Sequence, residues 1–126
     1  MEFSGRWIID KVVSFDDSNR MKYITRKEIE ESDDLDLKAY LSFIVDIKED
    51  NAYVLVDSKE ALEEAKEEGY TIYLNRYILL ESYPIIKRED GYYYQNGLED
   101  NKPNYIKLIL NEDNSLDMGQ LVLVRM

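Results

Sequence analysis

Apolar and polar residues alternate along much of this chain, and such a period of two is typical of β-strands with one buried face. The alternation is longest over residues 35–48, where Leu41, Phe43 and Val45 belong to the apolar side. It predicts a strand with that side in the core and the other side mostly in water. Another strand is predicted over residues 6–15. Six further strands are predicted: 52–56, 70–74, 77–86, 92–95, 105–110 and 116–125.

Two helices are predicted between these strands. Thr25, with Glu28 three residues later, forms a capping box that predicts a short helix over about residues 26–31. Ser58 precedes a run rich in Ala, Leu, Glu and Lys that extends to Glu68, where a glycine follows, so a longer helix is predicted there. Its apolar stripe is thin, and its glutamates form an anionic face that could dock a basic protein.

The spacing of the strands predicts a sandwich or a barrel. Most connections are short enough to join neighbouring antiparallel strands, which favours an up-and-down order, and closure would remove the exposed edges of the sheet. With 126 residues, two prolines and five glycines, the chain is expected to form one domain, 1–126, with one core and no long linker. The predicted fold is mostly β: an antiparallel up-and-down barrel of about eight or nine strands with one short and one longer helix.

The chain opens with a Phe-x-Gly-x-Trp signature at residues 3–7, which leads directly into the first predicted strand. This signature resembles that of the calycins, the lipocalins and fatty-acid-binding proteins. Together with the capped segment 25–30 and the hairpin 87–94, it makes the chain similar to small lipocalin-like proteins of low-GC bacteria, a group without an established activity. The resemblance implies that Trp7 packs across the closed end of the barrel beneath a late-strand arginine, for which Arg125 is the candidate. A cation–π contact worth about 0.5–2 kcal/mol would hold this structural pair.

The chain departs from the fatty-acid-binding proteins in two respects. Those proteins hold the ligand carboxylate with an Arg-x-Tyr in the last strand, whereas Met126 follows Arg125 here. They also place a helical lid after the first strand, whereas the longer predicted helix lies in the middle of this chain. The resemblance is therefore to the broad barrel and does not imply fatty-acid binding.

The chain has no cysteine and no histidine. Without cysteine, disulfides, thiolate metal sites and cysteine nucleophiles are excluded. Without histidine, the chain lacks the commonest general base and metal ligand near neutral pH. Neither acidic cluster, at residues 30–36 and 99–101, has the spacing of a calcium loop. We therefore expect no enzyme, no catalytic residue, no metal and no cofactor. Hydrolysis of a glycosidic bond by a pair of carboxylates is a distant third hypothesis, since the sequence does not show which two of the 27 acidic residues would form the pair.

The formal net charge of −11 should repel phosphate backbones and anionic membrane surfaces. No apolar run approaches the roughly 20 residues that a membrane-spanning helix needs, and the N-terminus lacks the pattern of a signal peptide. We therefore expect a cytoplasmic protein with neither a nucleic-acid partner nor membrane insertion.

A ligand site is conceivable if side chains do not fill the barrel. Leu41, Phe43 and Val45 would then form an apolar wall, and Tyr73 and Tyr93 would add hydroxyl groups for directed hydrogen bonds. Within the run of three tyrosines around Tyr93, the middle residue must face opposite to its neighbours. All five residues also fit simple core packing or strand propensity.

Two functions therefore remain open. The first is a non-enzymatic binding protein of unknown specificity that takes a small apolar or amphipathic ligand into the barrel. The second is an acidic intracellular interaction protein, such as an immunity-type inhibitor, with a filled barrel and a basic protein partner. The empty volume inside the barrel separates the two, because a cavity of a few hundred Å³ favours the first.

Overall fold

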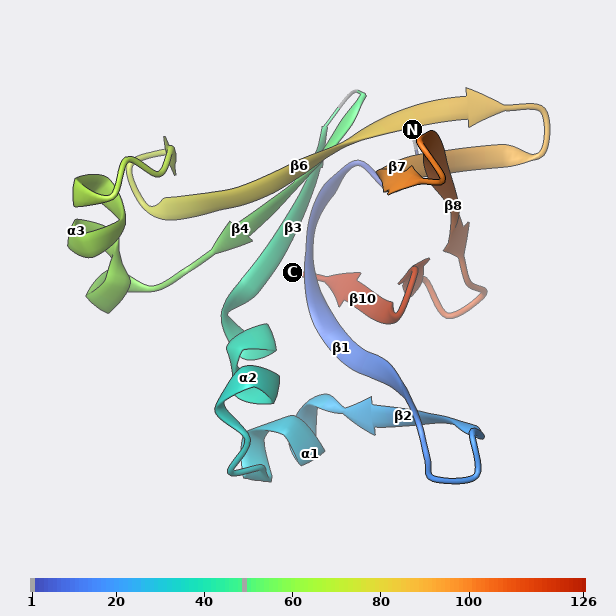
Figure 1. The fold of residues 1–126 in the computed structure, drawn as a ribbon, viewed down its shortest axis with the longest axis horizontal. Coiled ribbons are helices and arrows are strands. Elements are labelled where there is room, and N and C mark those ends of the chain that lie inside the picture. Colours follow the sequence, from blue (N-terminus) through green and yellow to red (C-terminus); the bar gives the residue numbers. More distant parts are fainter. Residues whose placement is uncertain (1, 49) are drawn as a thin grey trace.

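A computed structural model describes residues 2–48 and 50–126 and shows a closed antiparallel β-barrel (Figure 1). Eight strands follow one another around the wall, and the last pairs with the first. They are β1 (Gly5–Phe15), β3 (Phe43–Lys48), β4 (Asn51–Val56), β6 (Tyr77–Arg88), β7 (Gly91–Glu99), β8 (Lys102–Leu110), β9 (Leu116–Met118) and β10 (Leu121–Arg125). The predicted mostly-β, up-and-down barrel is confirmed.

Two short strands lie beside this ring. β2 (Met21–Thr25) forms a hairpin with the second half of β1, and β5 (Ile72–Tyr73) pairs with the start of β6. β5 covers only part of the strand predicted over residues 70–74, and the strand predicted over residues 116–125 is divided into β9 and β10 by a tight turn.

Both predicted helices are present. α1 (Arg26–Glu31) begins after Thr25, whose side chain forms the expected capping box with Glu28. α3 (Lys59–Glu67) begins after Ser58, whose hydroxyl accepts a hydrogen bond from the backbone N–H of Ala61. α3 lies near the end of β4 and the start of β6, away from α1 (Figure 1). None of the described helices is both long enough and apolar enough to cross a membrane.

The strand predicted over residues 35–48 is wrong in its first half. Residues 35–42 form α2 (Leu35–Lys38) and the 3-10 helix η1 (Ala39–Ser42), and β3 begins only at Phe43. The Asp34 carboxylate caps α2 by accepting hydrogen bonds from the N–H groups of residues 36 and 37. Leu37, Tyr40 and Leu41 all pack against the core, and their spacing of three and four residues fits one face of a helix, whereas alternation would turn Tyr40 away from the other two.

β3 is also buried on both faces rather than one. Val45 and Ile47 point into the barrel, while Ile44 and Asp46 are covered on the outside. The cover comes from β5 and the start of β6, whose Tyr73 and Tyr77 pack over the outer side of the sheet. The outer face of β3 is therefore shielded from water by β5 and the start of β6.

Trp7 and Arg125 are in contact where the first and last strands of the barrel pair. Trp7 is fully buried, and Arg125 is its partner in the β1–β10 register, with the guanidinium carbon 4.3 Å from the indole centroid. The indole Nε1 donates to the carbonyl of Phe3 at 2.9 Å, and Arg125 donates to two further carbonyls of the N-terminal segment. Gly5 has a φ of +123°, and a Cβ there would lie only 3.2 Å from Arg125 Nη1. This contact gives the glycine of the signature a physical reason.

Residues 25–42, which we call the lid segment, contain α1, α2 and η1 and pack against the barrel core (Figure 1). Ile29 of α1 is completely buried in the main core. Arg26 fastens the lid segment by donating to the carbonyl of Ile9 on β1 at 2.7 Å and to that of Leu41 at 3.2 Å. These contacts hold η1, the last part of the lid segment, beside the cavity described next.

Candidate ligand-binding site

A half-open cavity of about 500 Å³ lies in the barrel between η1 and the β9–β10 turn. Inward-facing apolar side chains from six strands form much of its wall: Ile9, Val45, Val54, Ile106, Met118 and Leu121. Four aromatic residues (Tyr40, Phe43, Tyr83 and Tyr94) and the polar residues Asn96 and Gln120 complete the lining, together with Gly119. The site thus combines an apolar wall with a few polar groups, as small-molecule sites commonly do.

The aromatic residues form two edge-to-face pairs at the cavity. Tyr40 of η1 contacts Phe43 with ring centroids 5.5 Å apart, and Tyr83 of β6 contacts Tyr94 of β7 at 5.7 Å. Tyr94 is 6% exposed, and its hydroxyl has no hydrogen-bond partner among the described residues. Since no fully buried side-chain oxygen among the described residues lacks a partner, the Tyr94 hydroxyl is not fully buried, and it lies beside Gly119 in the cavity lining.

The cavity lining is electrically neutral. Burial, together with a hydrogen bond donated to the Glu81 carboxylate, raises the pKa of Tyr83 to about 12. Burial also raises the pKa of Tyr94. Both phenols therefore stay protonated at neutral pH, and no lysine, arginine, aspartate or glutamate is among the described residues that line the cavity.

The wall opens sideways between β6 and β7. Their pairing runs from Arg88 and Gly91 only as far as Ile85 and Tyr94, beyond which the two strands separate. A second hollow of about 410 Å³ lies in this gap and is lined by residues 81–84 and 95–97. Tyr83 and Asn96 line both spaces, so the cavity and this side opening lie next to each other.

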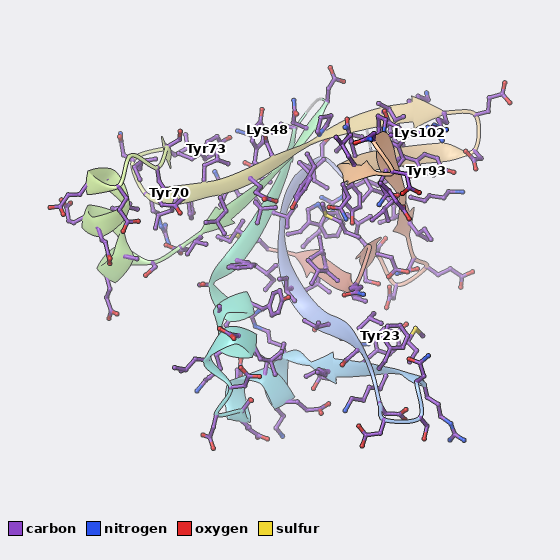
Figure 2. All side chains as sticks on the ribbon, viewed as in Figure 1. Tyr23, Lys48, Tyr70, Tyr73, Tyr93 and Lys102 are labelled. Atoms are coloured by element: carbon purple, nitrogen blue, oxygen red, sulfur yellow. The ribbon has the colours of Figure 1, made fainter. Side chains whose placement is uncertain are left out.

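Two of the five residues predicted to bind a ligand, Phe43 and Val45, line the cavity. Leu41 lies nearby in η1 but packs against the core instead. The prediction that Tyr73 and Tyr93 line the interior is wrong, and Figure 2 shows the two residues well apart along the long axis of the molecule. Tyr93 lies on the outer face of β7, where its hydroxyl donates to Asp90 at 2.8 Å.

The sequence prediction missed Tyr40, Tyr83, Tyr94 and Asn96. Alternation did place Tyr94 opposite to Tyr93, but it could not say which of the two faces inward, because tyrosine suits either side of a strand. Tyr40 was missed because its segment was predicted to be a strand.

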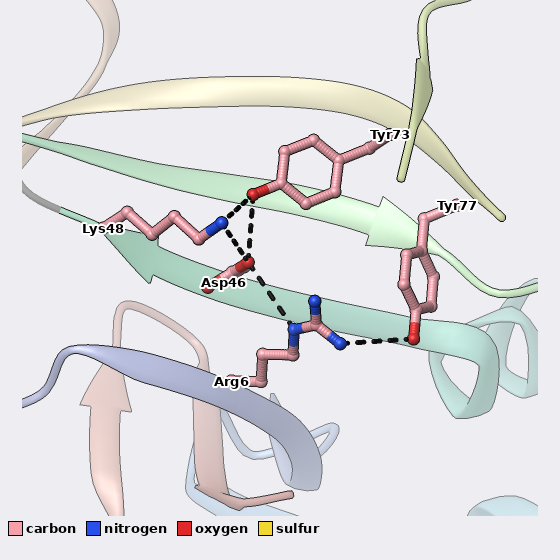
Figure 3. A network of polar contacts seen from close by, with 5 residues as sticks. All are labelled: Arg6, Asp46, Lys48, Tyr73 and Tyr77. Carbon is pink, nitrogen blue, oxygen red and sulfur yellow. Dashed lines mark hydrogen bonds and ion pairs between the residues drawn. The ribbon is translucent and has the colours of Figure 1, made fainter. Parts of the chain in front are cut away.

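Tyr73 belongs instead to a polar network on the outside of the barrel (Figure 3). Its centre is the Asp46 carboxylate, which is 1% exposed and accepts a hydrogen bond from the Tyr73 hydroxyl at 3.3 Å. Arg6 and Lys48 each place a nitrogen 3.6 Å from the same oxygen, and Arg6 also donates to Tyr77 at 3.4 Å. The buried charge is thus satisfied by the chain itself, and the network fastens β5 and β6 onto β3.

No protein-family model, no curated protein and no solved structure matches this chain. Within the described residues, no three acidic side chains lie close enough together to hold a metal ion. The function of the protein must therefore be inferred from the geometry of its own cavity.

Replacing Gly119 with alanine is expected to lower the free energy of unfolding by about 2 kcal/mol. Gly119 has a φ of +62°, and a Cβ there would lie 2.5 Å from the Tyr94 hydroxyl oxygen. Gly97 is a matched control, because it has a φ of +70° and nothing within 4 Å, so its replacement should cost only the backbone strain, about 1 kcal/mol. Urea unfolding of both variants measures the difference.

A double variant tests whether Tyr94 causes the additional loss. The Tyr94 ring carbon Cζ would be 3.8 Å from the new Cβ, an ordinary contact. In a Tyr94→Phe background, Gly119→Ala should therefore destabilise the protein no more than Gly97→Ala does. Equal losses for Gly119→Ala and Gly97→Ala in the unmodified chain would contradict the prediction.

Proposed function

We propose that this protein is a non-enzymatic, lipocalin-like binding protein that takes a small apolar or amphipathic ligand into its barrel. The cavity carries this proposal: its volume of about 500 Å³ lies within the range of small-molecule sites. The packing of Arg125 over Trp7 supports the resemblance to calycins. We place the protein in the cytoplasm because it lacks cysteine.

The chemistry of the lining favours binding over a reaction. Its polar groups are tyrosine hydroxyls and the amides of Asn96 and Gln120, and the pKa values of Tyr83 and Tyr94 are raised. Such groups orient a ligand through hydrogen bonds but do not act as nucleophiles or general bases at neutral pH. The apolar wall supplies affinity, and the hydroxyls and amides supply direction.

A basic protein partner is the second candidate. The exposed glutamates of α3 and its C-cap favour it, because they form a negative surface near the end of β4 and the start of β6: Glu60, Glu63, Glu64, Glu67 and Glu68. That hypothesis assumed a filled barrel, and the cavity argues against this assumption. The ligand-binding proposal is therefore the stronger one.

Titration with N-phenyl-1-naphthylamine, an uncharged fluorescent probe of apolar sites, tests the proposal. The unmodified protein should bind it saturably, and Val54→Phe, which places a phenyl group in the cavity, should weaken binding at least tenfold. Val13→Phe is the control, because Val13 is half-buried in β1 and does not line the cavity. Absence of saturable binding, or equal affinity of the Val54 and Val13 variants, would overturn the proposal.

A further inference from the structure

We infer that the ligand class is a cationic amphiphile, with its apolar body in the cavity and an ammonium-type head at Glu81 in the side opening. This inference rests on the proposed function and specifies its ligand. Three observations carry it: the direction in which Glu81 faces, the absence of positive charge from the lining, and the position of Tyr83.

A β-bulge turns Glu81 toward the interior. In the β4–β6 pairing, Leu55 lies opposite Leu79, but Val54 lies opposite Glu81, so Leu80 is an extra residue on β6. Cross-strand partners point to the same face of a sheet, and Val54 lines the cavity. Leu55 and Leu79 belong to the outer cluster, so without the bulge Glu81 would face outward with them. The bulge therefore directs Glu81 to the cavity side.

Glu81 belongs to a row of inward-facing cross-strand partners that continues around the wall of the barrel. Trp7 pairs with Val45, Val45 pairs with Val54, and Val54 pairs with Glu81. Trp7 and Val45 are buried core residues, whereas Glu81 is exposed. The row thus passes from two buried apolar side chains to an exposed carboxylate at the side opening, an order of polarity that matches an amphiphile.

The charges around the site favour a cation. Glu81 is the one charged side chain among the described residues that line the cavity or the side opening. An anionic head would meet this carboxylate and the net charge of −11 with no lysine or arginine in the lining to neutralise it. A cationic head could pair with Glu81 while remaining partly hydrated.

Tyr83 holds the carboxylate at the junction of the two spaces. Its hydroxyl donates to a Glu81 oxygen, and Tyr83 lines both the cavity and the side opening. An ammonium group beside Glu81 would therefore also lie close to Tyr83. The face of an aromatic ring attracts a cation, so Tyr83 adds to the attraction if it presents its face.

Displacement of bound N-phenyl-1-naphthylamine by three matched amphiphiles tests the inference. Decyltrimethylammonium, decanol and decanoate share a ten-carbon chain and differ in head charge. We expect the ammonium compound to displace the probe at least tenfold more effectively than decanoate, with decanol between them. Glu81→Gln should weaken the ammonium compound about fivefold and leave decanol unchanged, because glutamine keeps an acceptor for Tyr83 but removes the charge.

Glu60→Gln is the matched control, since it changes the net charge equally on exposed α3 and should leave all three affinities unchanged. Probe binding with equal displacement by decanoate and the ammonium compound would overturn the inference alone, as would an ammonium affinity that does not respond to Glu81→Gln. Failure of the unmodified protein to bind the probe would instead overturn the proposed function, and the inference with it.

Discussion

Replacing Trp7 with alanine is expected to lower the free energy of unfolding by about 3–5 kcal/mol. Trp7 is the largest of the fully buried side chains, and alanine would leave a cavity in the core of the barrel. The variant also loses the hydrogen bond to the Phe3 carbonyl and the contact with the Arg125 guanidinium. Since small domains are stable by only about 5–15 kcal/mol, this single change could remove much of the stability.

Urea unfolding followed by circular dichroism measures this effect, because the chain has one tryptophan and the variant loses its fluorescence. Tyr23→Ala serves as the control: Tyr23 is an exposed aromatic residue on β2, and its removal should change stability by less than about 1 kcal/mol. A loss below about 1.5 kcal/mol for Trp7→Ala would mean that the packing around Trp7 is not a main source of stability.

The second large effect is expected at the lid segment, where Ile29→Ala should cost about 2–4 kcal/mol. Ile29 is completely buried, although α1 has only six residues. A helix of this length is not stable by itself, so its order depends on the docking of Ile29 into the core. The loss should therefore be concentrated in residues 25–42 before the barrel itself opens.

Hydrogen exchange distinguishes this local loss from general destabilisation. Amide protection in α1, α2 and η1 should fall in Ile29→Ala, while protection in β3 and β4 should change less. Lys27→Ala is the control on the same helix, because Lys27 is exposed and its replacement should leave protection intact. A uniform loss of protection along the chain would show that the lid segment and the barrel unfold as one unit.

Features that depend on residues close in sequence were predictable. The capping box at Thr25 and the N-cap at Ser58 set where α1 and α3 begin, because a side-chain oxygen there satisfies backbone N–H groups within three residues. Alternation identified most of the strands, and the short connections indicated their order. The Trp7–Arg125 pair was predicted from a resemblance and from the position of Arg125 in the last strand.

The direction in which individual side chains face was not predictable. Residues 35–42 satisfy both periodicities, and packing of Leu37, Tyr40 and Leu41 against the core favours the helix. Tyr83 and Glu81 face the cavity side only because the extra residue Leu80 shifts the register of β6 against β4. Such a bulge is defined by the register between two strands, so the residues of one strand alone do not reveal it.

The amino-acid sequence by itself determined the fold class, the strand order and the two main helix starts, because these follow from local capping and from periodicity. Only the tertiary structure decided which tyrosines line the cavity, that β5 and the start of β6 cover the outside of β3, and that the wall opens between β6 and β7. Each of these depends on register between segments far apart in the chain, where a shift of one residue exchanges the inner and outer faces of a strand.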